Sequence, residues 1–549
     1  FNKTKIQLDL NKLRANFNES DIDKMKFDIQ DISVSGLNTI ADIGITTESE
    51  DNTTSILPYI LLNKIELQNI KIKYSSLQKP VLNVNLEKYT GNKIEADLNF
   101  RKVNAGNQEL NHSQIAYFTN AEPPAINKSE QKSWNINISN IKLANNTFSM
   151  NALNKAPLTS FVSDTMVVTG INLNASNIRY NADTTYLKLK EASFINGQFS
   201  MVKFRTQFLM TNTSIEAKDV DLVTTNSSLK GNILLKYPSF ETIKNQLQQL
   251  TINTEIQSSR ISASDIIWFN PKLVKNTIFS NKQNYITISG NVKGKINDLQ
   301  GNNIHIESGK NTIIHTNINI KGLPDISKAN YDIPNFKIIS GKSDVEQFID
   351  KKLLTNIKLP SIFQLSGHFK GSMLTFNTLL NLNSSSGAVI IKAKKNKEAY
   401  SLQLQTHKLD VGYLLSVPSL GQVTAGAEIN GNGLNSNINS RVNLLASEIY
   451  FNKYNYTNLS ANFILKNKEI QGEASLKDTN IEMAISGLID LDENNTKYII
   501  KINVKGADLH ELHFTESDLS IGIIAEVDLK GNSATTLNGD AGISQVTLA

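Results

Sequence analysis

The sequence predicts an all-β chain, an elongated and bent antiparallel sheet with a few short helices. The main sign is alternation of apolar and polar residues with period two, clearest from Tyr285 to Asn302. Alternate side chains of a strand point to opposite faces, so this pattern gives one apolar and one polar face. The pattern recurs along the chain, in strands of about six to ten residues joined by turns rich in Asn, Gly, Asp and Lys.

The stretch from Tyr285 to Asn302 sets the pattern. Ile286, Ile288, Val292 and Ile296 share one parity, and the residues of the other parity are mostly polar. Two glycines on the apolar parity indicate a bend, a bulge or a close approach by another group.

Three later segments repeat this alternation, at Phe363–Met373, Val423–Gly431 and Ile523–Asn532. The spacing between the copies is irregular, so the chain is not a solenoid of fixed period. The pattern is instead a theme repeated with insertions of variable length.

The composition excludes several classes of protein. With 549 residues, 40% of them hydrophobic and 19% charged, the chain can bury a large apolar surface and is not disordered by composition. It has no cysteine, which excludes disulfide scaffolds, thiolate metal sites and Cys nucleophiles. The net charge of +5 is small and spread out, so we expect no nucleic-acid partner.

The sequence contains no signal peptide and no apolar run long enough to span a bilayer as a helix. It begins at Phe1 rather than Met. We therefore expect the chain to be a portion of a longer protein, with any anchor outside it.

Taken in order, residues 1–120 predict a β-rich segment. Residues 121–133 contain a Pro pair without periodicity and predict a linker or long loop. Strands resume over 134–260 and continue through the repeated segment 261–549.

Short helices are predicted at two places, with one further turn at 409–416. The first is Phe240–Leu250, and the second is Ser343–Leu354, where Ser343 and Glu346 form a capping box.

Several all-β architectures are compatible with these strands. An outer-membrane barrel would need aromatic girdles, and a propeller would need a constant blade period; the sequence has neither. A string of sandwiches and a long bent sheet with its apolar parity facing into a groove both remain open.

No catalytic chemistry is predicted. His510 and His513 lack the spacing of an HExxH motif, and in a strand they would point to opposite faces. His305 and His315 lie on the polar parity, so we expect them to be solvated, and the sequence indicates no obvious partner for either. No nucleophile or nucleotide-binding motif is present, so we expect no catalytic residue, no metal, no cofactor and no enzymatic activity.

From about Ser214 to Ala549 the chain closely resembles the TamB family of the AsmA-like superfamily, in its Bacteroidota form. Residues 134–213 resemble the preceding AsmA-like part more loosely, and residues 1–120 match in style. The segments that carry the resemblance are DVDLVTTNSSLKGNILLKY, ITISGNVKGKINDLQGNNIHI, LPSIFQLSGHFKGSM, EIYFNKYNYTNLSANFILKNKEIQGEASLKD and IIAEVDLKGN.

The resemblance implies a β-taco groove with an apolar interior and passage of phospholipids between the inner and the outer membrane. It implies a bacterial periplasmic protein that is anchored in the inner membrane by a helix outside this chain. It also implies an Omp85-family barrel partner such as TamA, through regions outside this segment. On this basis 1–120 and 134–260 are AsmA-like and 261–549 is TamB-like.

We expect a passive lipid conduit. The alternatives are a scaffold or chaperone that assembles outer-membrane barrel proteins by β-augmentation, and a structural array of β-sandwiches. The expected lipid-lining residues are Ile286, Ile288, Val292, Ile296, Ile318, Ile320, Phe363, Leu365, Phe369, Val423, Ile429, Val527 and Leu529.

Overall fold

A computed structural model describes residues 4–43, 56–77, 79–119, 133–151, 160–162, 165–275, 279, 281–346, 357–433, 437–491, 496–532 and 536–549. The chain is all-β, as predicted, and divides into two compact units, Phe1–Ile296 and Asn297–Ala549. Of the predicted linker 121–133, all but the last residue lie outside the described residues. The expected boundary between residues 260 and 261 falls inside a strand, Thr251–Ser262.

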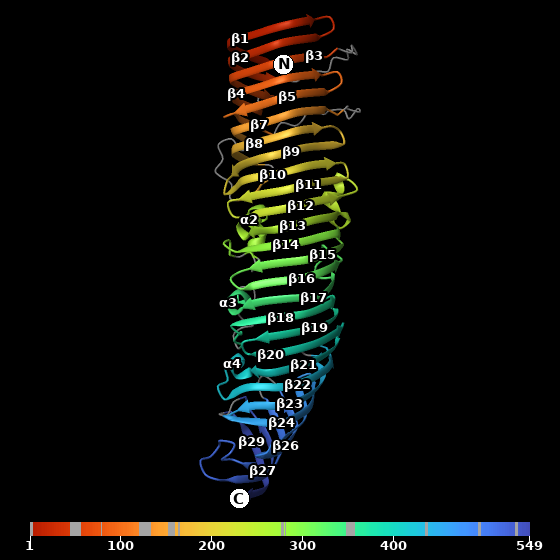
Figure 1. Cartoon of the computed structure of the whole chain (residues 1–549). Helices are drawn as coiled ribbons and strands as arrows, with labels where there is room; N and C mark the ends of the chain where they lie inside the picture. Colours follow the sequence, from red (N-terminus) through yellow and green to blue (C-terminus); the bar gives the residue numbers. More distant parts are fainter. Residues whose placement is uncertain are drawn as a thin grey trace. The chain divides into compact units, whose positions relative to one another are not determined.

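In the first unit the strands largely follow one another in chain order (Figure 1). β2 is parallel to β3, and β7 is parallel to β5 and β6, so the antiparallel prediction needs correction at these junctions. Parallel neighbours cannot be joined by a tight turn, and long connections precede β3 and β7. The strands are β1 (Lys5–Asp21), β2 (Lys26–Ile43), β3 (Tyr59–Ser76), β4 (Lys79–Asp97), β5 (Lys102–Asn111), β6 (Gln114–Tyr117), β7 (Asn135–Met150), β8 (Met166–Tyr180), β9 (Thr184–Asn196), β10 (Phe199–Thr211), β11 (Ser214–Thr224), β12 (Ser228–Lys236), β13 (Thr251–Ser262) and β14 (Tyr285–Lys295).

In the second unit each strand pairs with the next one along the chain, and these pairings are antiparallel. The strands are β15 (Asp298–Ser308), β16 (Thr312–Lys321), β17 (Asn330–Gly341), β18 (Ile362–Gly371), β19 (Thr375–Ser384), β20 (Gly387–Asn396), β21 (Ala399–Asp410), β22 (Leu420–Asn432), β23 (Asn439–Phe451), β24 (Tyr454–Lys466), β25 (Glu469–Lys477), β26 (Ile481–Asp490), β27 (Lys497–Asp508), β28 (Ser520–Lys530) and β29 (Asn538–Leu548).

Many strands are longer than the six to ten residues expected, because bulges interrupt the alternation without ending the strand. β3 has 18 residues and β4 has 19. In β11, Ala217 pairs with Ile233 and Val220 pairs with Gly231. The bulged strand therefore has one more residue between these two pairs than its partner β12 has. The extra residue shifts the parity and returns the next apolar side chain to the same face.

The bulge residues of β11, β15 and β21 adopt the left-handed conformation. Asp219, Asn303 and Lys408 have φ values of 54°, 51° and 47°. Asn and Asp tolerate this region better than most residues, which accounts in part for the many asparagines in the strands.

A side chain of the neighbouring strand accepts a hydrogen bond from the bulge amide. Asp219 N donates to Asn232 Oδ1 at 3.0 Å, and Asn303 N donates to Asn317 Oδ1 at 2.7 Å. Lys408 N donates to Thr424 Oγ1 at 3.1 Å. An amide turned out of the sheet is thereby satisfied within the protein.

The predicted helices at Phe240–Leu250 and 409–416 are confirmed as short elements. The first is α1 (Phe240–Asn245) followed by η1 (Leu247–Gln249), and the second is α4 (Val411–Leu415).

The helix predicted at Ser343–Leu354 is described only at its start, as α3 (Lys342–Val345), because residues 347–356 lie outside the described residues. Gly341, not Ser343, is its N-cap, so the predicted capping box is wrong. Asp344 faces the β15–β16 turn instead and is 2% exposed. It accepts hydrogen bonds from Lys310 N at 3.1 Å, Asn311 N at 2.7 Å and Thr312 Oγ1 at 3.0 Å.

Burial raises the pKa of the Asp344 carboxyl, but these donors outweigh burial, and the net pKa lies below its ordinary value. Gly309 in this turn has φ of 62°, and a Cβ there would lie 2.6 Å from the Asp344 carboxyl carbon. The β15–β16 turn therefore packs closely against the Asp344 side chain of α3, and a side chain at position 309 would collide with it.

We expect Asn303→Val to lower the free energy of unfolding by about 2 kcal/mol, because a β-branched residue is strained at positive φ. Asn303→Gly should change it by less than about 0.5 kcal/mol. Urea unfolding followed by circular dichroism measures both. Asn319→Val, on the extended strand β16, is the matched control; an equal loss in this control would contradict the argument.

We expect Asp344→Asn to lower the free energy of unfolding by about 2 kcal/mol at pH 7, since one acceptor becomes a donor that faces the backbone amide of Lys310 or of Asn311. A lowered pKa stabilises the fold above the ordinary carboxyl pKa, and this contribution is lost as the pH falls through the folded-state value. The difference between wild type and variant should therefore shrink below about pH 4 in urea titrations. Asp332→Asn, whose ion pair with Lys370 is exposed, should cost less than about 1 kcal/mol. A pH-independent loss in Asp344→Asn would contradict this account.

Candidate functional site

The strand register of the second unit brings apolar side chains into rows that cross the sheet. Each row has one residue from each successive strand, and directly paired residues point to the same face. The first apolar row runs from β15 to β29 as Ile306, Ile314, Ile338, Leu365, Leu382, Val389, Thr406, Ala425, Ala446, Leu459, Leu476, Met483, Val504, Ile523 and Val546.

Further apolar rows run beside the first on the same face. The second apolar row is Ile304, Thr316, Phe336, Gly367, Leu380, Ile391, Leu404, Ala427, Leu444, Ala461, Ala474, Ile485, Ile502, Ala525 and Ile543. The third apolar row is Phe369, Thr378, Ala393, Leu402, Ile429, Val442, Phe463, Gly472, Gly487, Ile500, Val527 and Ala541.

The opposite face of the same strands is mostly polar, with a few exposed apolar side chains such as Leu445, Ile464 and Ile499 among the polar ones. Its side chains hydrogen-bond to one another, as in the ion pair between Lys501 Nζ and Glu526 Oε1 at 2.7 Å. Along each strand, one residue lies between the members of the second and third apolar rows, and its side chain points to the opposite face. These residues form the polar row His368, Leu379, Lys392, Gln403, Glu428, Asn443, Asn462, Glu473, Ser486, Lys501 and Glu526.

Most side chains of the apolar rows are only partly buried. In the first row Val389, Ala446 and Leu476 are buried, at 8%, 3% and 6% exposure, and most of the others are partly buried. A second sheet packed on this face would bury its side chains nearly completely, as in the core of a sandwich. The side chains of the apolar rows are therefore less completely buried than those of a sandwich core.

The first unit has apolar rows of the same kind. One row is Leu13, Val34, Leu67, Tyr89, Leu110, Leu143, Leu173 and Ala192, from β1 to β9 without β6. A second row is Leu187, Phe208, Ala217, Ile233, Thr254 and Val292, from β9 to β14.

The predicted lining residues of the second unit fall on the apolar face. Leu365 belongs to the first apolar row, and Phe369, Ile429 and Val527 belong to the third. The other predicted residues lie an even number of positions from a row residue on the same strand, or pair with a residue of the apolar face. They are Ile318, Ile320, Phe363, Val423 and Leu529.

In the first unit, Val292 ends the second row, and Ile286 and Ile288 pair with Ile261 and Ser259. Ile296 lies one residue beyond β14. All the predicted lining residues of both units are half-buried. Whether they contact lipid stays a prediction.

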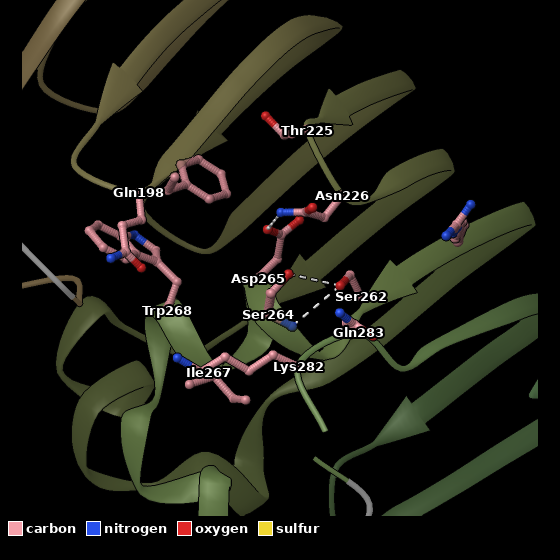
Figure 2. A pocket seen from close by; sticks show the side chains of 12 residues that line it. Gln198, Thr225, Asn226, Ser262, Ser264, Asp265, Ile267, Trp268, Lys282 and Gln283 are labelled. Atoms are coloured by element: carbon pink, nitrogen blue, oxygen red, sulfur yellow. Dashed lines mark hydrogen bonds between the residues drawn. The ribbon is translucent and has the colours of Figure 1, made fainter. Parts of the chain in front are cut away.

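The edge of the first unit carries a pocket that the sequence did not predict (Figure 2). It is formed where α2 (Ala263–Phe269), inserted between β13 and β14, faces the β9–β10 and β11–β12 turns. The sequence signal for α2 is the Ser-x-x-Asp spacing of Ser262 and Asp265. Ser262 is the N-cap and its Oγ accepts a hydrogen bond from Ser264 N at 3.3 Å, whereas Asp265 bonds to other turns. We call this the rim pocket; its volume is about 530 Å³.

The rim pocket has an aromatic wall that adjoins the apolar face. Phe199 and Trp268 are stacked at 6.4 Å between ring centroids, and both are buried. They belong to one hydrophobic cluster with Leu189, against which Leu173 and Leu187 of the two rows pack.

The remaining lining of the rim pocket is polar and charged. Asp265, which is 9% exposed, accepts hydrogen bonds from Thr224 Oγ1 at 2.5 Å and Asn226 Nδ2 at 3.2 Å. The guanidinium of Arg260 lies 3.7 Å from the centre of the Tyr285 ring, and Lys282 also lines the pocket. Figure 2 shows Asn226, Ser262 and Asp265 around the same opening.

His305 and His315 have partners that the sequence did not indicate. They pair directly across β15 and β16, with 3.2 Å between their Nδ1 atoms, and His305 Nε2 lies 2.9 Å from Glu307 Oε1. The expected strand context of His510 and His513 is wrong, because they flank Leu512 in a turn. Throughout the described residues, no three His, Cys, Asp or Glu side chains come together as a metal site would require.

No protein-family model, curated protein or solved structure matches the chain. Among the described helices, none combines the length and apolar character needed to cross a bilayer.

We expect Phe199→Ala in a Trp134→Phe background to shift the emission of Trp268 to longer wavelength and to lower the free energy of unfolding by about 3 kcal/mol, because a buried ring is removed. Fluorescence during urea unfolding measures both effects. Phe240→Ala is the control, since Phe240 is exposed and contacts Tyr237 instead. Unchanged Trp268 emission in Phe199→Ala would contradict the packing described for the rim pocket.

Proposed function

We propose that this chain is a segment of a passive lipid conduit, in which acyl chains of phospholipids lie on the apolar rows. The observation that carries the proposal is that these rows continue from strand to strand while most of their side chains are only partly buried. A folded protein rarely leaves so extended an apolar face uncovered without a ligand or partner for it.

Hydrocarbon is the occupant that best fits this face. Moving an acyl chain through water costs about 0.8 kcal/mol per CH₂, or roughly 12 kcal/mol for sixteen carbons. An unbroken apolar path avoids this cost at every step. The polar row on the opposite face contacts water, so in this proposal one face of the sheet is hydrated and the other contacts acyl chains.

The small side chains on the apolar face leave space above the sheet. Ala427, Ala461 and Ala474 lie in the second apolar row, and Gly472 and Gly487 are adjacent in the third. The strand bulges add bending, which favours a concave apolar face of the β-taco type. These features support a groove with room for chains.

The resemblance to the TamB family supplies the setting of the proposal. It places the conduit in the bacterial periplasm, between an inner-membrane anchor and an Omp85-family barrel such as TamA. The movement of lipid would need no nucleotide, metal or covalent step in this segment.

Photocrosslinking with mass spectrometry tests the proposal. With p-benzoylphenylalanine at Leu365 or Ile288, we expect phospholipid adducts after isolation from bacterial membranes, because both side chains lie on the apolar face. The same group at Ser366 or Lys293, on the opposite face of the same strands, should give roughly tenfold less adduct. Leu365→Arg should lower co-purified lipid, whereas Ser366→Arg should not.

Equal adducts from both faces, or a folded protein without lipid, would overturn the conduit proposal. Crosslinks to barrel-protein substrates in place of lipid would favour the scaffold alternative.

A further inference from the structure

We propose that His305 and His315 bind one divalent transition-metal ion of the class that imidazole prefers, such as Zn²⁺, with their two Nδ1 atoms as ligands and water completing the coordination. The two residues lie on the polar face of β15 and β16, between the apolar-row residues of the same strands. The inference is independent of the lipid conduit, because it concerns the opposite face of the sheet.

The strand register holds the two imidazoles together. His305 of β15 pairs directly with His315 of β16, so both side chains leave the same face at neighbouring points. The two Nδ1 atoms are 3.2 Å apart, whereas the ring centroids are 4.4 Å apart. The rings therefore approach each other with the edges that carry Nδ1.

This separation of the Nδ1 atoms fits a shared metal ion. Two nitrogen ligands of one tetrahedral zinc ion, each about 2.0 Å from the metal, lie roughly 3.3 Å apart. Since the Nδ1 atoms already lie 3.2 Å apart, zinc binding requires little movement of either side chain.

Glu307 prepares His305 to act as a ligand. Its Oε1 lies 2.9 Å from His305 Nε2. An ionised carboxylate only accepts hydrogen bonds, so Nε2 carries the proton, and Nδ1 of the neutral ring keeps its lone pair. A carboxylate that accepts from the second ring nitrogen is the common partner of a metal-binding histidine, because it fixes the tautomer and raises the basicity of the ligand atom. Glu307 is therefore a positioning residue for this site.

The metal-free pair is held by a proton in place of the metal. With His305 Nδ1 as the acceptor, His315 Nδ1–H is the donor of the hydrogen bond between the rings. When the metal binds, this proton leaves His315 Nδ1, and Nε2 of the same exposed ring takes one up from solvent. The exchange releases no net proton.

Two protein ligands make an open and exchangeable site. The described residues hold no group of three metal-ligating side chains, so water or a second molecule supplies the other ligands. Lys337 of β17, which pairs with His315 and is exposed, adds a positive charge nearby. Structural zinc sites have four protein ligands, so we expect the fold to form without the metal.

Isothermal titration calorimetry of the chain, without a polyhistidine tag, tests the site with ZnCl₂. We expect saturable binding that His305→Gln and His315→Gln each weaken about tenfold or more, because a single imidazole lacks the second, intramolecular contact. Circular dichroism verifies that these variants fold. The matched control His510→Gln/His513→Gln removes two histidines that lie in a turn, and it should bind zinc as the parent does.

Two further measurements identify the ligands. Glu307→Ala should weaken zinc binding about tenfold, and Glu307→Gln less, since its amide oxygen still accepts from His305 Nε2. X-ray absorption of the zinc-loaded parent should show two imidazole nitrogens together with oxygen ligands. A roughly hundredfold excess of MgCl₂ should not displace the zinc, because Mg²⁺ prefers oxygen ligands.

Unchanged zinc affinity in His305→Gln and His315→Gln, an equal loss in the His510→Gln/His513→Gln control, or a parent chain that binds no zinc would each overturn the proposal. Equal affinity in Glu307→Ala and the parent would overturn the role of Glu307. Lipid adducts at Leu365 bear on the conduit alone, so the two proposals fail separately.

Discussion

The hydrogen bond to the bulge amide is the interaction on which the rest of this fold depends. Each bulge turns one N–H out of the regular sheet pattern, and the amides of Asp219 and Asn303 find their acceptors in Asn232 and Asn317 of the next strand. The extra residue also returns the following apolar side chain to the same face. Without it, every residue beyond the bulge would point the wrong way and the apolar rows would stop there.

The strand bulges also explain which parts of the fold could be predicted from the sequence. Alternation is sufficient where a strand has no bulge of its own, and Leu365 of β18 lies in the first apolar row as its parity predicts. Across Asp219 or Lys408 the parity changes, and a strand then looks like two shorter ones. The parallel pairing of β2 with β3 could not be inferred, because it depends on a long connection and not on a local pattern.

The rim pocket was beyond sequence reasoning for a different reason. Its polar residues come from separate turns, such as Asn226 and Lys282, that only the stacking of strands brings to one edge. The capping spacing of Ser262 and Asp265 could have indicated α2, but not what the helix faces. The continuity of the apolar rows likewise follows from register, which alternation within one strand does not specify.

The row architecture of the second unit makes its length easy to change during evolution. Each strand adds one residue to every row and advances it by about 4.8 Å. A duplicated hairpin adds two antiparallel strands, so the chain direction is the same after the insertion as before it. The strands that follow therefore keep their direction, and their apolar side chains stay on the same face of the sheet. Gain or loss of hairpins would thus alter the reach by steps of about 10 Å without redesign of any existing contact surface.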